Sequence, residues 1–193
     1  MNLIERVKNL LTKPKEEWQV INGETLSGMP LIVSYLLPLA AASAIASFIG
    51  YAFLFHGGIG VKAGLIYAVI AFLQLVIAVY VNALITDALA PSFSSEKNLN
   101  KSIQLVVYAA TPVYIGSLLN IIPAIGWLGS LAGAIYSIYL LYIGLPIMKK
   151  TPEDKAPIYL IVIILVLAVI YWLISYIILR VFWTSLYGPS IYY

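Results

Sequence analysis

The longest uncharged stretch of the sequence covers residues 102–148, 47 positions without a charged side chain. A helix needs only about 20 apolar residues to cross a bilayer, so this stretch is long enough to cross twice. Pro123 and Gly126 lie near its middle, and both favour a turn of the chain. We therefore predict two antiparallel membrane helices, at about 103–121 and 125–148.

Three further apolar runs are each long enough to cross the membrane. The predicted fold class is all-α, a polytopic membrane protein with a five-transmembrane-helix bundle over residues 31–193. The five spans are expected at about 31–55, 62–90, 103–121, 125–148 and 157–181.

Residues 1–30 form a separate and more polar segment. Apolar side chains recur there at helical spacing, at Leu3, Val7, Leu10 and Leu11, while basic side chains lie largely on other faces. This pattern predicts an amphipathic helix that lies in the cytoplasmic membrane interface. A solvated leader that is only partly helical is the alternative.

The composition agrees with a membrane protein. The chain is 62% hydrophobic and 10% charged, with a mean hydropathy of +0.97, whereas soluble domains carry about 25% charged residues. The absence of cysteine excludes disulfides, iron–sulfur clusters and thiol catalysis. The single histidine, His56, argues against a histidine metal site. We interpret His56 as a loop residue, with a proton relay as the alternative.

The basic residues predict the orientation of the chain. With five spans and a cytoplasmic N-terminus, the inner segments 1–30, 91–102 and 149–156 hold nine Lys and Arg residues, against Lys62 and Arg180 outside. This bias follows the positive-inside rule and places the C-terminus outside. The sequence pI is near 9.0, but scattered basic residues do not form the single basic face that nucleic-acid binding requires.

Basic and aromatic residues near the ends of the predicted helices are candidates for anchoring the protein at the membrane surface. They are Arg6, Lys8, Lys13, Trp18, Lys149 and Lys150.

The second predicted span carries a polar stripe at four-residue spacing, which ends next to Asp87. Polar groups in lipid are costly without partners, so the stripe should face protein or water. Pro112 and Pro146 free the backbone carbonyls four residues earlier. We predict that these groups form a polar pocket that faces the cytoplasm. Its residues are Gln74, Asn82, Asp87, Tyr108, Thr111, Pro112, Tyr139, Tyr142 and Pro146.

The alternative to a pocket is purely structural. In that interpretation the prolines are ordinary helix kinks, and Asp87 forms an ion pair or hydrogen bond near the end of its helix. Candidate partners for Asp87 are Lys97, Lys101 and the hydroxyl of Tyr108.

Two classes of function stay open, because the sequence holds no His-Glu-x-x-His motif, no paired carboxylates within spans and no nucleophile with a histidine partner. The first is a non-enzymatic membrane scaffold or organiser that binds itself or other membrane proteins. Close helix packing, indicated by the small residues Gly129 and Gly133, favours it. The second is a transporter or channel for an ion or small solute that uses the predicted pocket. Neither requires a cofactor or a metal.

Several separated motifs, in order along nearly the whole chain, resemble bacterial proteins of the Yip1-domain family. They are the opening Met1–Trp18, Leu89–Phe93 with Glu96–Asn98, Tyr108–Pro112 and Tyr136–Pro146. The resemblance implies a five-span protein of the bacterial cytoplasmic (inner) membrane with a cytoplasmic N-terminus.

Eukaryotic members of the family act in the early secretory pathway and associate with Rab-type GTPases and with one another. Tyr108 and Pro112 resemble part of a motif in those relatives, with Val107 where a glycine is expected. Their longer N-terminal region with an Asp-Leu-Tyr-Gly-Pro motif is absent, and the similar Ser185–Pro189 lies at the other end of the chain. The resemblance therefore carries no Rab-binding residues over to this sequence.

Overall fold

The computed structural model describes residues 2–54 and 60–187, and every regular element within these ranges is helical. Four helical segments there are long and apolar enough to cross a membrane: Gly28–Leu54, Val61–Phe93, Leu99–Ile121 and Pro123–Lys149. A fifth apolar segment, Ala156–Ile170, is shorter. The expected all-α class is thus found, while a count of five spans stays a prediction. His56 lies outside the described residues.

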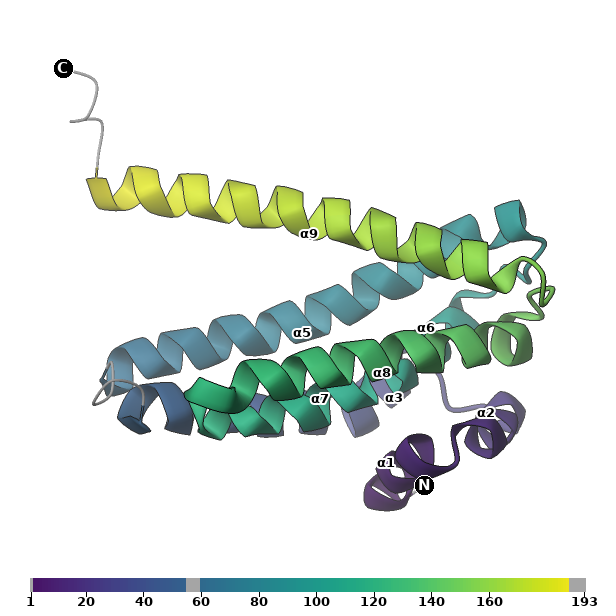
Figure 1. Cartoon of the computed structure of the whole chain (residues 1–193), viewed down its shortest axis with the longest axis horizontal. Coiled ribbons are helices and arrows are strands. Elements are labelled where there is room, and N and C mark those ends of the chain that lie inside the picture. The colour runs from purple at the N-terminus through teal and green to yellow at the C-terminus, as the bar shows by residue number, and fades with distance from the viewer. Residues whose placement is uncertain (1, 55–59, 188–193) are drawn as a thin grey trace.

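The chain begins with two short helices, α1 (Leu3–Thr12) and α2 (Pro14–Gly23). The side chain of Asn2 caps α1 by accepting a hydrogen bond of 3.1 Å from the backbone of Ile4. The proline that opens α2 has no N–H group to leave unpaired at a helix start. The two helices form a cap at one end of the bundle (Figure 1).

The first long segment is not a uniform α-helix. It consists of α3 (Gly28–Leu31), the π-helical η1 (Ile32–Leu36), α4 (Leu37–Ile49) and the π-helical η2 (Gly50–Leu54). The wider turn η1 ends two residues before Pro38, whose nitrogen has no hydrogen to donate to the regular ladder.

The second long segment is α5 (Val61–Leu89), followed by the 3-10 turn η4 (Ala90–Phe93). Only 17% of the residues in the most apolar stretch of this segment are buried within the protein. Its exposed side chains are mostly Leu, Ile and Val, so lipid must cover much of this helix.

The third long segment is broken where a single helix over 103–121 was predicted. It comprises α6 (Leu99–Ala109), α7 (Thr111–Ser117) and the 3-10 turn η5 (Leu118–Ile121). The break falls at Ala110 because Pro112 cannot continue the hydrogen-bond ladder of α6.

The fourth long segment, α8 (Pro123–Lys149), returns antiparallel to α7 and packs closely on it. A Cβ atom added to Gly133 would lie 2.8 Å from the carbonyl carbon of Pro112, and one on Gly129 would lie 2.8 Å from Leu119. The small-residue pair of α8 therefore packs within the chain, against α7. Lys150, with a φ of +51°, ends the helix.

The last helix, α9 (Ala156–Tyr187), crosses the bundle and then runs away from the other helices (Figure 1). Its first half packs against the bundle, where Tyr159, Leu160 and Ile163 are buried. The ring of Tyr159 stacks on Phe93 with 4.6 Å between their centroids.

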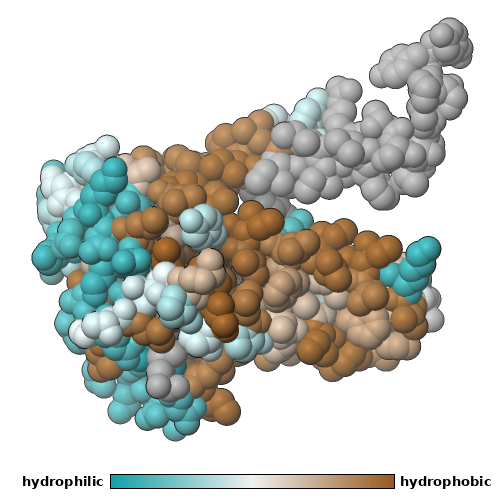
Figure 2. All heavy atoms as spheres, turned by 180° about the vertical axis from the view of Figure 1, so that it is seen from behind, coloured by the Kyte–Doolittle hydropathy of each residue, from teal (hydrophilic) through white to brown (hydrophobic). Residues whose placement is uncertain are grey.

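The surface separates into a polar end and an apolar body. Hydrophilic residues gather at the end that carries the cap, and apolar residues cover most of the visible remainder (Figure 2). Such a body is suited to lipid, and the polar end to water and head groups.

Candidate functional site

A buried charge cluster joins three helices at the polar end. Asp87 lies near the end of α5, and its Oδ1 accepts hydrogen bonds from Lys149 Nζ at 2.9 Å and Ser102 Oγ at 3.1 Å. The Lys149 ammonium also donates to Ser102 Oγ at 2.6 Å and to the carbonyl of Asn98 at 3.1 Å. The cluster therefore ties the ends of α5 and α8 to the start of α6.

The partner of Asp87 differs from the candidates that the sequence suggested, which were Lys97, Lys101 and the Tyr108 hydroxyl. The carboxylate pairs with Lys149 because α8 runs back to the same end of the bundle at which α5 finishes. The side chain of Lys149 is fully buried. Its charge is therefore compensated inside the protein, whereas the sequence suggested a membrane-surface anchor.

A second buried charge lies in the cap. Arg6 of α1 is 4% exposed and forms ion pairs with Glu17 of α2 and with Glu24, just beyond α2. Its guanidinium also lies over the ring of Tyr108 in α6, 5.3 Å from the ring centroid. One side chain thus holds both helices of the cap and attaches them to the bundle.

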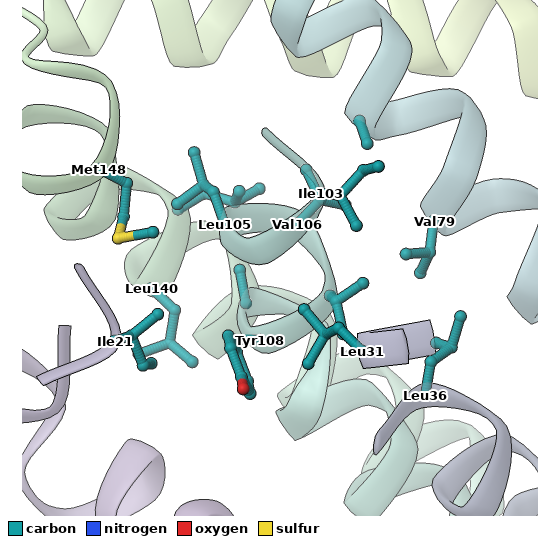
Figure 3. Packing of buried hydrophobic residues seen from close by; sticks show 14 of the residues in the cluster. Ile21, Leu31, Leu36, Val79, Ile103, Leu105, Val106, Tyr108, Leu140 and Met148 are labelled. Carbon is teal, nitrogen blue, oxygen red and sulfur yellow. The ribbon is translucent and has the colours of Figure 1, made fainter. Parts of the chain in front are cut away.

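Apolar contacts between the cap and α8 reinforce this attachment. Trp18 is fully buried, and a Cβ atom on Gly144 of α8 would lie 3.0 Å from its ring. Ile21 of α2 and Leu140 of α8 belong to the same cluster of buried hydrophobic residues (Figure 3). Trp18 is therefore a core residue of the folded protein, whereas the sequence suggested an interfacial anchor.

Hydrogen bonds to backbone carbonyls complete the joint. The Gln104 amide donates to the carbonyls of Glu24, at 3.2 Å, and Leu26, at 2.8 Å. The hydroxyl of Tyr136 in α8 donates to the carbonyl of Leu11 at 3.0 Å. The cap is consequently continuous with the membrane domain.

The carbonyl that Pro112 frees is already occupied. The hydroxyl of Thr111 donates to the carbonyl of Tyr108 at 2.7 Å, and the Thr111 oxygen lies 2.8 Å from the hydroxyl of Tyr35. The rings of Tyr35 and Tyr108 also meet edge to face, with 4.8 Å between their centroids. The break in the third segment is thus closed by protein groups.

The other residues of the predicted pocket lie in separate surroundings. Asn82 accepts a hydrogen bond of 3.1 Å from Thr86 Oγ1, while Gln74 lines a cavity of about 510 Å³ farther along α5. Tyr142 and Pro146 line a hollow of about 380 Å³, whose lining includes neither Asp87 nor Tyr108. Tyr139 is 41% exposed. A pocket common to all nine residues stays a prediction.

Three of the proposed surface anchors are exposed, namely Lys8, Lys13 and Lys150. Lys150 forms an ion pair of 2.9 Å with Glu96, and the hydrogen bond from Lys150 lowers the pKa of that carboxyl below its ordinary value. Arg6, like Trp18 and Lys149, is buried instead. Burial follows from internal partners that lie far away in the sequence.

Sequence reasoning missed the acceptors and donors that complete both clusters. Glu17 and Glu24 face Arg6 only because the chain reverses between α1 and α2, and the sole signal of that reversal is Pro14. Ser102 carries no local signal. In the part of the chain that the structure describes, no three His, Cys, Asp or Glu side chains form a group that could hold a metal ion.

A comparison with protein families places this architecture. The Yip1 domain matches residues 8–177, a range that includes the second half of α1, all of α2, the four long segments and part of α9. The chain belongs to the Yip1 family. It is therefore a Yip1-type integral membrane protein.

The family assignment is supported by a curated relative. The chain is 27% identical to the inner membrane protein YohC of Escherichia coli K12 over 162 residues, which cover 79% of this chain and 83% of the relative. The YohC protein of a second strain, O6:H1, matches to the same extent. No solved structure matches the chain.

Proposed function

We propose that this Yip1 protein is a non-enzymatic membrane scaffold, which presents its N-terminal cap to partners at the cytoplasmic face of the bacterial inner membrane. The proposal includes five spans, a cytoplasmic N-terminus and an external C-terminus. Nine basic residues in the proposed inner segments, against two outside, support this orientation. The inner-membrane location of the YohC relative supports the compartment.

The observation that carries the proposal is the rigid joint between the cap and the bundle. Arg6 is buried between two carboxylates, and Lys101 adds a hydrogen bond of 2.6 Å to the carbonyl of Asn22. A segment held this firmly is suited to present a fixed surface, since little ordering entropy is lost on binding. Apolar side chains remain exposed on it, including Ile4 at 76% and Val20 at 55%.

Transport is the alternative function. It requires that the predicted pocket bind an ion or small solute near Asp87. The carboxylate is engaged by Lys149 and Ser102, which favours a structural role over a transport role for this residue.

Single cysteines test the scaffold directly, because the natural chain has none. Val20→Cys in the cap and Val61→Cys at the other end of the bundle are matched, since both valines are 55% exposed. We expect a thiol-reactive cross-linker in native membranes to join Val20→Cys to a discrete protein, a second copy or another membrane protein. Arg6→Ala, which releases the cap, should abolish that product, and Val61→Cys should not form it.

Reconstitution separates the two functions. If Val20→Cys yields only monomer, while proteoliposomes show solute flux that falls in Asp87→Asn, the scaffold proposal is wrong and transport replaces it.

A further inference from the structure

A half-open cavity of about 510 Å³ lies between the helices of the bundle, away from the charge clusters. Its open side is formed by exposed residues of α5, among them Leu73, Gln74 and Ile77. Side chains from α4, α5, α7, η5, α8 and α9 line it. Its walls are mainly aliphatic, and its polar lining residues are all uncharged: Ser43, Ser47, Gln74, Ser117, Asn120 and Ser130.

The cavity lies at membrane depth. Gln74 is the fourteenth of the 29 residues of α5, so it lies about 20 Å along the axis from either end of that helix. The hydrocarbon core of a bilayer is about 30 Å thick. The amide of Gln74 is therefore near the middle of the membrane, where water does not supply hydrogen bonds.

The polar groups of the cavity divide into two sets. The hydroxyls of Ser43 and Ser117 donate to the carbonyl of Tyr114 at 3.0 and 2.9 Å, and that of Ser47 donates to the carbonyl of Ser43 at 3.0 Å. These donors are satisfied within the protein.

The second set is unsatisfied. Among the described residues, the side chains of Gln74, Asn120 and Ser130 have no hydrogen-bond partner. An amide without a partner at this depth costs free energy, so the cavity has donors that require an acceptor.

We propose that this cavity binds an uncharged lipid that brings carbonyl oxygens to the middle of the membrane, the chemistry of an isoprenoid quinone. The amide donors of Gln74 and Asn120 suit carbonyl acceptors, and the absence of charge in the lining suits a neutral ring. The aliphatic walls suit the isoprenoid tail. Glycerolipids fit less well, because their ester carbonyls lie at the edge of the hydrocarbon core, about 15 Å from its centre.

This inference is independent of the scaffold proposal, since it uses none of the residues of the cap. The test measures binding of decylubiquinone to the full-length protein in nanodiscs, as quinone retained per protein across a concentration series. Dioleoylglycerol and phosphatidylglycerol are measured in parallel as ester-carbonyl and charged competitors.

Three variants sharpen the measurement. Gln74→Leu keeps the size and removes the amide, and we expect it to weaken quinone binding about tenfold, as one lost hydrogen bond implies. Ala71→Phe fills the cavity and should abolish saturable binding. Ile66→Phe is the matched control, because Ile66 is 52% exposed on the same helix and does not line the cavity.

The expected result is saturable quinone binding that the two cavity variants reduce and Ile66→Phe leaves unchanged. Quinone retention that is equal in all three variants would overturn the proposal, since it would reflect partition into the bilayer. Displacement of the quinone by either glycerolipid at similar concentrations would also overturn it.

Discussion

Lys149 places its ammonium nitrogen 2.9 Å from Oδ1 of Asp87, although the two residues lie 62 positions apart in the chain. The lysine side chain is fully buried and that of the aspartate is 12% exposed. The pair closes the polar end of the bundle by joining the last turns of α5 and α8. The fold at this end therefore requires that the buried charges of Lys149 and Asp87 compensate each other.

Breaking the pair should destabilise the protein strongly. Lys149→Met leaves the Asp87 carboxylate buried without its counter-ion, and we expect a loss of about 3 kcal/mol or more in the free energy of unfolding. The double variant with Asp87→Asn should recover much of that loss, because no unpaired charge remains. Unfolding in detergent measures both, and additive losses would contradict the coupling.

The adjacent lysine supplies the control for this experiment. The side chain of Lys150 is 80% exposed and its pair with Glu96 lies in water. We therefore expect Lys150→Met to leave the unfolding temperature nearly unchanged.

Arg6 should be required for the attachment of the cap. Leu10 is fully buried, so Leu10→Cys should react slowly with a maleimide in the folded protein. Adding Arg6→Ala leaves Glu17 and Glu24 facing each other without a cation, and we expect Leu10→Cys to be labelled many times faster. Lys8→Gln, which changes an exposed charge on the same helix, should leave the labelling rate unaltered. Equal rates in all three backgrounds would show that packing alone holds the cap.

Close contact between α7 and α8 should tolerate no added side chain. A Cβ on Gly133 would collide with the carbonyl group of Pro112, so we expect Gly133→Ala to cost about 1–3 kcal/mol of stability. Gly23→Ala is the matched control, because no atom lies within 4 Å of its added Cβ. Thermal unfolding in detergent compares the two, and equal unfolding temperatures would contradict the packing.

The orientation of the chain has a direct test. In intact cells, an impermeant maleimide should label Lys62→Cys and leave Lys8→Cys unlabelled, because the two positions lie on opposite sides of the membrane in our proposal. Permeabilised cells should give labelling of both. Labelling of Lys8→Cys in intact cells would reverse the proposed topology.

The sequence predicted the helical class because long apolar stretches are visible in the sequence without knowledge of packing. It also predicted an effect of Pro112, since the missing hydrogen is local. The prediction that the carbonyl of Tyr108 stays free was wrong. The hydroxyl of Thr111 reaches that carbonyl once α6 and α7 are formed.

The candidate site was less predictable for a related reason. The partner of Asp87 is set by which helix ends meet in space, and Lys149 looked like a surface anchor because it begins a basic loop. The burial of Trp18 depends likewise on Gly144, 126 positions away, which leaves room for its ring. Tertiary contacts of this kind leave no periodic trace in a single sequence.

The hydrogen bond between Tyr35 and Thr111 imposes an order on assembly. The two residues lie 76 positions apart, so the first segment leaves the ribosome long before the group that pairs with its tyrosine hydroxyl. Tyr35 lies about 10 Å into the segment, where hydrocarbon supplies no hydrogen-bond partner for its hydroxyl. The first segment therefore lacks the partner of this hydroxyl until the third segment has been synthesised. Insertion of this chain is in that respect a joint event of two helices, with α5 already synthesised between them.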